Sequence, residues 1–501
     1  MGSLRDKVNA FVEEKLRNYK VNVRGNKVIH DTILGTNLFY AHEIAVLDSP
    51  ILQRLRRISQ VDVVSLIWPS GNHNRFEHSL GVAIIGDKFI RSLAEKGLVK
   101  NFSEELYCIR MAGILHDCGH GPFSHMSEML FQHCDDLKEE KKSDPKLAAT
   151  NPNAHEILSY LIVTSEAFKE FYNKNIATQV WGRKMDLDFI GELIIGYISD
   201  SQKGFLVDII NGAFDADKLD YIQRDSHFTG VQMILDLDRL FYTLDVITVY
   251  NEIRSREEKR LTIDVSGVST LEQIVFDKMM LQSTVYHHQK VRAAEGLFSS
   301  IFEEIFEHKL TVYGKQFNSA ADYLYLTDDD IYNLAKQSDI PQSCSILAHN
   351  LLNRNLPKRA LAISGRTVTK ETVNNLWKLM RLYENPKEMK SIREKIADEA
   401  KKTEARITYK DIWLDMPKIA KFKEGDQWAI KSEGHDKGYL TLHDLFPVDQ
   451  WVKAFSQNKW MGHVYTYQQY REVVHKASKK VIEDEYDIKF NDFSYICCKI
   501  Q

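Results

Sequence analysis

Three histidines and an aspartate crowd into the ten residues HDCGHGPFSH (116–125), and most of the positions between them are small. The preceding stretch 103–117 carries apolar residues at helical spacing, so we expect a helix that runs into a glycine-rich turn at His116 and Asp117. Polar side chains at this density after an apolar helix are costly to bury without a partner ion. The segment therefore predicts a metal site.

Two further stretches carry the same kinds of side chain. HNRFEHS (73–79) places His78 at the start of a helix expected over 78–97, and FDADKLDYIQRDS (214–226) is rich in aspartate. The aspartates of the latter are Asp215, Asp217, Asp220 and Asp225. Imidazole nitrogens and carboxylate oxygens together suit Fe, Zn, Mn or Co, and Mg less well. Two histidines and two carboxylates from separate helices would leave coordination positions open, as a catalytic site requires.

Composition limits the other possibilities. The 501 residues include 66 basic and 70 acidic side chains, giving a net charge of −4, which argues against a protein coated with positive charge for nucleic acid. The six cysteines show no CxxC pairing, so we expect a reducing, cytoplasmic compartment. No run approaches the roughly 18 apolar residues of a membrane span, and the charged, amphipathic first 16 residues do not resemble a signal peptide.

The chain is expected to be mostly helical up to about residue 310. Two short helices are expected over 186–200 and 204–214, and 268–309 predicts one long helix or a kinked pair. The stretch 248–265 predicts a β-hairpin with a charged tip, and the charged residues 137–153 predict a mobile surface loop.

After about residue 360, short strand-like runs alternate with charged segments, including one very polar helix expected over 385–406. The runs are LAISGRTV (361–368), ARITYKDIWLDM (405–416) and DQWAIKS (426–432). This alternation predicts a smaller α+β lobe after a mainly α core.

The ordered string QRLRRISQ, HNRFEHSLGV, HDCGHGPFSH and DADKLDYIQRD resembles the HD-domain phosphohydrolase superfamily, in particular its dNTP triphosphohydrolase branch. The resemblance covers residues 27–310 and is closest to the catalytic core of the sterile-alpha-motif-and-HD-domain dNTPases and their bacterial relatives, without the sterile-alpha-motif domain. It implies an N-terminal helix or arm (1–26), an HD phosphohydrolase core (27–310) and a C-terminal regulatory and oligomerisation lobe (311–501).

The resemblance also implies roles for individual residues. The family's metal ligands fall on His78, His116, Asp117 and Asp217. Its catalytic histidines fall on His120, His125 and His155, of which His125 is the leading candidate for the general acid and His120 its support. A divalent metal lowers the pKa of water and so supplies the nucleophile, while a histidine can protonate the departing 5′-oxygen.

Substrate contacts follow from the same resemblance. They fall on Gln60, Arg75, Lys218, Tyr221, Asp225, Lys278, Tyr286 and His287. The arginine and lysines would meet phosphates, Gln60 would read the 3′-hydroxyl, and Tyr286 would exclude a 2′-hydroxyl. The sequence departs from the family pattern in three places, because His287 replaces a glutamine, Val61 a leucine and Lys278 an arginine.

In the resembling enzymes, nucleotides also bind between subunits and drive assembly. The corresponding residues are Lys27, Asp48, Gln53, Arg56, Arg239, Arg354 and Lys358. We therefore expect activation by GTP or a dNTP, Mg²⁺ bound with those nucleotides, and a homotetramer or dimer. His30 replaces an asparagine at the second nucleotide, which leaves the identity of that nucleotide open.

The predicted reaction is metal-dependent hydrolysis of a dNTP to the deoxynucleoside and inorganic triphosphate, with Fe, Mn, Zn or Mg in the HD site. Alternatives are an HD phosphohydrolase of another nucleotide (dGTP alone or a signalling nucleotide), or a nuclease or binder of nucleic-acid ends. The near-neutral charge and the lack of alternating aromatic and basic residues oppose the nucleic-acid alternative. An inactive nucleotide sensor is opposed by the intact set of ligands and histidines.

Overall fold

The computed structural model describes residues 2–23, 25–131, 133–338, 340–418, 429–432 and 438–498. The chain divides into two compact units that alternate along the sequence. The first contains Met1–Leu281, Thr311–Ile331 and Lys423–Phe446, and the second contains Gln282–Leu310, Tyr332–Phe422 and Pro447–Gln501. These units follow packing rather than chain order, so the domain boundaries predicted at residues 26 and 310 stay predictions.

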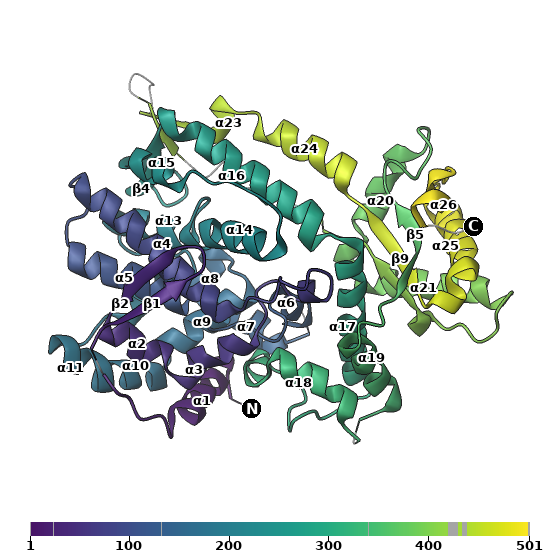
Figure 1. The fold of residues 1–501 in the computed structure, drawn as a ribbon, viewed down its shortest axis with the longest axis horizontal. Coiled ribbons are helices and arrows are strands. Elements are labelled where there is room, and N and C mark those ends of the chain that lie inside the picture. Colours follow the sequence, from purple (N-terminus) through teal and green to yellow (C-terminus); the bar gives the residue numbers. More distant parts are fainter. Residues whose placement is uncertain are drawn as a thin grey trace. The chain divides into compact units, whose positions relative to one another are not determined.

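The first unit is mainly helical (Figure 1). Its helices are α1 (Leu4–Leu16), α2 (Ala41–Leu47), α3 (Pro50–Gln53), α4 (Arg75–Glu95), α5 (Phe102–Leu115), α6 (His125–Phe131), α7 (Asp135–Ser143), α8 (Pro145–Thr150), α9 (Ala154–Thr164), α10 (Glu166–Tyr172), α11 (Thr178–Trp181), α12 (Leu187–Ile194), α13 (Gly204–Asn211), α14 (Ala216–Thr229), α15 (Leu237–Thr243), α16 (Val268–Leu281) and α23 (Leu442–Leu445). Helix α18 (Asp328–Asn333) begins in this unit and ends in the second. The mainly α core predicted from the sequence is confirmed.

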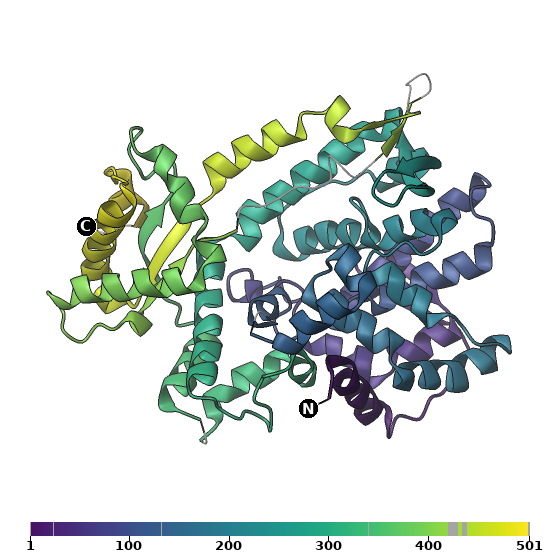
Figure 2. The ribbon, with the colours of Figure 1, turned by 180° about the vertical axis from the view of Figure 1, so that it is seen from behind.

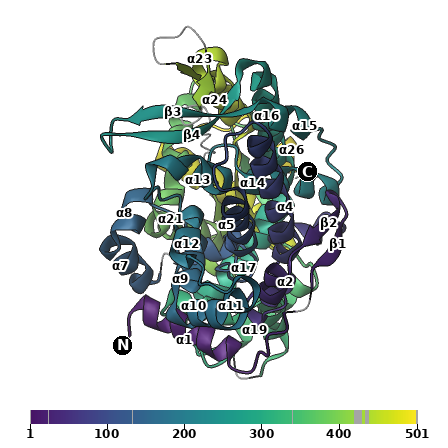
Figure 3. The same cartoon turned by 90° about the vertical axis from the view of Figure 1, so that its left-hand side faces the viewer.

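Two small sheets complete the first unit. Strands β1 (Lys27–Asp31) and β2 (Gly35–Phe39) form an antiparallel hairpin. The predicted hairpin at 248–265 is confirmed as β3 (Leu244–Asn251) and β4 (Arg256–Asp264), which Figure 3 shows edge-on. Strands β7 (Ala429–Lys431) and β8 (Tyr439–Thr441) extend it to the order β3-β4-β7-β8.

Helices α4 and α5 lie side by side in the core of the first unit. Glycines permit their close approach, because a Cβ on Gly113 would lie 2.9 Å from the Cα of Ala83. The facing side chains Ile85, Phe89 and Ile109 are fully buried. This contact fixes the beginning of α4 against the end of α5, where the predicted histidines lie.

The N-terminal helix α1 is part of this core. Ser3 and Asp6 form a capping box at its start, and its buried Val8 and Phe11 belong to the helix that packs against α9 and α10 (Figure 3). The predicted N-terminal helix is therefore an integral layer of the first unit.

The predicted mobile loop over 137–153 is wrong, because this stretch forms helices α7 and α8. Asp144 caps α8 by accepting hydrogen bonds from the backbone nitrogens of Lys146 and Leu147, and Pro145 occupies the first helical position. Leu137 and Leu147 are buried. The many charged residues are the solvent-facing sides of two short amphipathic helices.

The second unit contains the three-stranded antiparallel sheet β5-β9-β6 with helices, and Figure 2 shows it from behind. Its elements are α17 (Gln289–Glu307), α19 (Gln342–Leu352), β5 (Lys358–Ile363), α20 (Leu376–Met380), α21 (Pro386–Lys401), β6 (Ile412–Asp415), α24 (Val448–Lys459), β9 (Gly462–Thr466), α25 (Arg471–Tyr486) and α26 (Phe493–Cys498). The predicted α+β lobe is confirmed.

Several elements here differ in extent from the prediction. The predicted polar helix is α21, which buries Ile392 and Ile396 along one face. The strands are shorter than the strand-like runs, and residues 426–428 of the third run lie outside the described residues. The predicted helix over 268–309 is a pair, α16 and α17, with a π-helical turn at Gln282–Tyr286 between them. Among the residues described, no helix is both long and apolar enough to cross a membrane.

Candidate functional site

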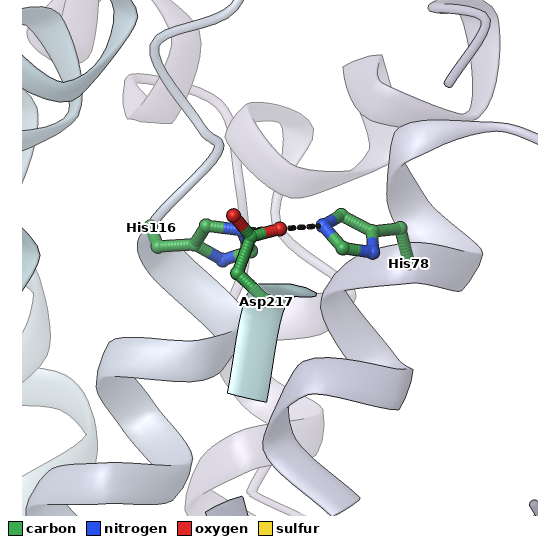
Figure 4. Close-up of side chains that lie close together, drawn as sticks. All are labelled: His78, His116 and Asp217. Carbon is green, nitrogen blue, oxygen red and sulfur yellow. Dashed lines mark ion pairs between the residues drawn. The ribbon is translucent and has the colours of Figure 1, made fainter. Parts of the chain in front are cut away.

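Three helix ends supply the predicted metal ligands. His78 lies in the first turn of α4, which Asn74 caps, and His116 follows directly after the last residue of α5. Asp217 lies in the first turn of α14, which Asp215 caps. Figure 4 shows the Asp217 carboxylate between the two imidazole rings. Its Oδ1 lies 2.9 Å from His78 Nε2 and 3.8 Å from His116 Nε2.

The other ring nitrogen of each histidine fixes the orientation of its imidazole. His78 Nδ1 donates to Asp220 Oδ2 at 2.7 Å, and His116 Nδ1 donates to the carbonyl of Gly113 at 2.8 Å. Each Nε2 therefore keeps its lone pair for a ligand. Gly81 makes the first contact possible, since a Cβ there would lie 1.9 Å from Asp220 Oδ1.

These ring nitrogens give a direct test of whether the site suits a metal. The Nε2 atoms of His78 and His116 are buried, and within the described parts of the chain neither has a hydrogen-bond partner. Asp117 is the fourth predicted ligand, and its Oδ1 lies 3.3 Å from His116 Nε2. Two buried imidazole nitrogens facing two carboxylates match the donor set of a divalent transition metal.

The electrostatics of the cluster also favour a cation. Burial opposes a charge on His78, but the carboxylates of Asp217 and Asp220 raise its pKa to about 9. For Asp117, burial is outweighed by Arg75 and the neighbouring histidines, so its pKa is held well below the usual range. Ionised carboxylates beside imidazole rings attract either a proton or a metal ion. The proton and the metal compete for the same imidazole nitrogens.

A second cluster contains the three predicted catalytic histidines. The rings of His120 and His155 stack 4.0 Å apart with an interplanar angle of 13°, and the ring of His125 meets that of His120 edge-on at 5.5 Å. His120 Nε2 lies 3.3 Å from Asp117 Oδ1, which joins this cluster to the metal ligands. Gly119 allows the stack, because a Cβ there would lie 2.4 Å from the carbonyl oxygen of His155.

The three rings differ in their affinity for protons. His155 donates from Nδ1 to Glu128 at 2.6 Å, and this carboxylate outweighs burial and raises the pKa of His155 to about 9. Burial and the charge of Arg75 lower the pKa of His120. The ring of His125 is partly open to solvent, yet desolvation in its recess and the charge of Arg75 lower its pKa too. At neutral pH the proton therefore resides on His155.

Arg75 connects the two clusters. Its guanidinium is buried and donates to Asp117 Oδ2 at 2.7 Å, to Ser124 Oγ at 2.8 Å and to the Gln60 carbonyl at 3.2 Å. It also donates to His125 Nε2 at 3.2 Å, so that nitrogen is an acceptor in this arrangement. For His125 to act as an acid from Nε2, Arg75 has to turn to another acceptor, such as a phosphate.

The remaining predicted substrate contacts fall in both units. Lys218 donates to Asp215 Oδ2 at 2.6 Å and to the Gly212 carbonyl at 2.8 Å. Tyr221 and Asp225 lie further along the same helix, Gln60 is buried near the start of α4, and Lys278 lies on α16. Tyr286 and His287 belong to the second unit, where His287 Nε2 accepts from Gln282 Nε2 at 2.9 Å. Burial lowers the pKa of His287 to about 4.

The predicted activator residues are also divided between the units. Lys27 lies 3.3 Å from Asp48 Oδ2, Gln53 accepts from Arg56 at 2.9 Å, and the Arg56 guanidinium stacks 3.8 Å from the Phe76 ring. Arg239 on α15 donates to the carbonyl of Ser266 at 2.8 Å. Arg354 and Lys358 belong to the second unit. His30 contacts Thr36 within the β1–β2 hairpin.

The sequence interpretation assigned no role to several residues that support these clusters. Asp220 and Glu128 orient His78 and His155 respectively. Arg54, fully surrounded by protein, donates to the carbonyls of Cys118 and His120 at 3.0 and 2.7 Å. For Asp220, its position one helical turn after Asp217 was a signal in the sequence. The contacts of Glu128 and Arg54 depend on tertiary packing and left no such signal.

Comparison with protein families agrees with this geometry. A family model described as HD domain matches residues 75–194, and one described as HD associated region matches residues 245–489. The first range contains His78, His116, Asp117 and the three clustered histidines. The chain thus contains an HD domain followed by an HD-associated region, and the candidate site lies mainly in the HD domain.

The chain is also similar to individual proteins. The chain is 30% identical to mouse and human deoxynucleoside triphosphate triphosphohydrolase SAMHD1, over 52% and 60% of its own length. These matches cover 42% of the mouse protein and 47% of the human protein, so the chain spans about half the length of these relatives. It is also 26% identical to an uncharacterized protein of Methanocaldococcus jannaschii, over 88% of this chain and 79% of that protein.

Proposed function

We propose that the protein hydrolyses deoxynucleoside triphosphates to the deoxynucleoside and inorganic triphosphate. The observation that carries this proposal is the pair of buried Nε2 atoms of His78 and His116 that face the carboxylates of Asp217 and Asp117 beside three clustered histidines. A divalent ion bound by these four residues (Fe, Mn, Zn or Mg) would activate water and offset phosphate charge. The similarity to SAMHD1 supports a dNTP as the substrate.

The protein's own residues divide the remaining work. Water adds to the α-phosphorus, the bond from phosphorus to the 5′-oxygen breaks, and that oxygen needs a proton. Arg75, Lys218 and Lys278 would bind the phosphates. Because Arg75 then leaves His125 Nε2, and because phosphate charge raises the pKa of His125, that ring becomes able to deliver the proton.

His155 and His120 would support this step. His155, which Glu128 holds protonated, would add a positive charge beside the stacked His120 ring and so help to stabilise bound phosphates. The sugar would contact Gln60, Tyr221, Asp225, Tyr286 and His287.

Activation by GTP or a dNTP belongs to the same proposal. Lys27, Asp48, Gln53 and Arg56 lie on adjacent elements of the first unit and offer an acid, an amide and two cations, which suits a guanine nucleotide. Arg239, Arg354 and Lys358 would bind the second nucleotide, with Mg²⁺ on the phosphates, in a homotetramer or dimer. Sizing the protein with and without GTP tests this, and an unchanged mass and rate with every nucleotide would contradict it.

Product analysis tests the reaction. Purified protein with Mn²⁺ or Mg²⁺ is expected to release triphosphate from at least one dNTP, as read by ion-exchange chromatography. Asp217→Ala is expected to abolish both turnover and metal binding. Asp135→Ala is the control, because that carboxylate is 85% exposed and pairs with Lys138 on the surface of α7. Release of pyrophosphate, or activity retained by Asp217→Ala, contradicts the proposal.

A further inference from the structure

His73 joins two residues that the proposed function places at the sugar. Its backbone carbonyl accepts a hydrogen bond from the Gln60 nitrogen at 3.0 Å, and its ring Nε2 donates to Asp225 Oδ1 at 2.8 Å. Gln60 lies 13 positions before His73, and Asp225 lies 152 positions after it on α14. One residue thus connects two distant segments of the first unit.

The ring of His73 is held rigidly. It is 1% exposed and stacks on Phe228, with ring centroids 4.6 Å apart and an interplanar angle of 15°. Because a carboxylate only accepts hydrogen bonds, Nε2 is the donor in this contact. A rigid donor of this kind restricts the rotamer of the Asp225 carboxylate.

The neighbouring acceptors indicate what the cluster recognises. The side-chain oxygen of Gln60 and the Nδ1 atom of His73 are both buried, and neither has a hydrogen-bond partner among the residues that the structure describes. The Gln60 side-chain oxygen and the Asp225 carboxylate belong to the two residues that His73 contacts, and both are acceptors, which suits a ligand that donates hydrogen bonds. A sugar hydroxyl is such a donor.

The same region is tied to the metal ligands. Arg75 donates to the Gln60 carbonyl at 3.2 Å and to Asp117 at 2.7 Å. Gln60 is therefore held at its nitrogen by His73 and at its carbonyl oxygen by Arg75. This chain of contacts sets the position of a hydroxyl-binding group relative to the proposed reaction centre.

We infer that His73 is a positioning residue for recognition of the sugar 3′-hydroxyl: it orients Asp225 from its side chain and Gln60 from its backbone. The inference rests on the proposed function and adds a determinant of substrate specificity to it. Discrimination in favour of the 3′-hydroxyl depends on the Nε2 donor, whereas metal binding does not.

The test compares a 2′-deoxynucleoside triphosphate with its 2′,3′-dideoxy analogue in the full chain. His73→Phe keeps a flat ring for stacking on Phe228 but removes the donor, and His73→Gln keeps an amide donor near the position of Nε2. His42→Phe is the matched control, because His42 is also a buried histidine but packs against the aromatic rings of Tyr40, Tyr107 and Trp181.

In the wild type, the dideoxy analogue is expected to have a kcat/KM lower by roughly 10- to 100-fold, since it leaves buried acceptors unpaired. His73→Phe is expected to lower kcat/KM for the deoxy substrate by about tenfold and to reduce this discrimination by the same factor, with metal content unchanged. His73→Gln restores most of the discrimination, and His42→Phe leaves it as in the wild type.

The outcomes separate the two proposals. Equal losses on both substrates in His73→Phe and His73→Gln, with the ratio unchanged, mean that His73 has only a structural role and overturn the inference while the proposed function stands. If the wild type releases triphosphate from no dNTP, both proposals fail. Should His73→Phe not fold, the wild type decides the question, because an equal kcat/KM for the deoxy substrate and its dideoxy analogue would overturn the inference.

Discussion

Asp220 offers a sharp test of how this chain prepares a metal ligand. It accepts the Nδ1 proton of His78 at 2.7 Å, and it also accepts from Arg224 at 2.7 and 2.9 Å. His78 is 0% exposed, so no water can replace the lost partner without rearrangement. Asp220 therefore determines which nitrogen of His78 is available to a metal.

Two substitutions separate orientation from charge. Asp220→Asn keeps an oxygen that can accept from Nδ1 and loses the charge, so metal affinity is expected to fall about tenfold. Asp220→Ala loses both and is expected to weaken affinity by about 100-fold. These changes correspond to about 1.4 and 2.7 kcal/mol.

The assay is metal content at buffered free metal, read by mass spectrometry, together with the rate on a dNTP at limiting and saturating metal. Asp208→Asn is the matched control, since Asp208 is a buried carboxylate whose hydrogen bonds, among the residues that the structure describes, come from Arg260 at 2.8 and 2.6 Å and from the Leu261 nitrogen rather than from a predicted ligand. Excess metal is expected to restore the rate of Asp220→Asn. Unaltered metal affinity in both Asp220 variants would refute the argument that this carboxylate prepares His78.

Three further perturbations have defined outcomes. The pKa of His155 is raised to about 9, whereas in the unfolded chain it lies near 6.5. The pairing of His155 with Glu128 therefore stabilises the fold fully below about pH 6.5, and this contribution is lost as the pH rises through about 9. Urea unfolding should show a loss of up to about 3 kcal/mol over this range, and Glu128→Gln should abolish this pH dependence. Gly119→Ala is expected to lower the free energy of unfolding by about 1–3 kcal/mol and to reduce activity, because its Cβ would lie 2.4 Å from backbone atoms. Gly25→Ala is the control: its Cβ would have no neighbour within 4 Å, so the free energy of unfolding should change by less than about 0.5 kcal/mol. Arg54→Met leaves three backbone carbonyls without their donor and should cost about 3 kcal/mol in thermal or urea unfolding, and a loss below about 0.5 kcal/mol would contradict the role given to this guanidinium.

For three of the predicted metal ligands, the sequence correctly predicted that the residues lie close together. His78, His116 and Asp217 come from stretches that are far apart, yet their ligand atoms lie within 4.8 Å of one another. The density of histidine and aspartate at helix ends pointed to the three stretches, and the family resemblance selected Asp217 among the aspartates of the third stretch. Such a pattern is readable because burying those groups demands a partner.

The supporting contacts could not be predicted in the same way. The pair of His73 and Asp225 joins positions 152 residues apart, and nothing in either local pattern specifies the other. The close approach of α4 and α14 depends on Gly81, which in the sequence is only a weak helix former. The error at 137–153 has the opposite cause, because local charge concealed two helices whose few apolar residues are buried.

The alternating composition of the two units has a consequence for synthesis of the chain. Asp328 accepts from the backbone nitrogens of Ser59 and Phe123, which precede it by 269 and 205 residues. Both partners flank predicted site residues, and Asp328 leaves the ribosome long after them. The loops that contain Ser59 and Phe123 therefore lack their hydrogen bonds to Asp328 during most of translation. A nascent chain halted before residue 328 should be protease-sensitive in these loops, and they should become protected only after the segment that contains Asp328 has been synthesised.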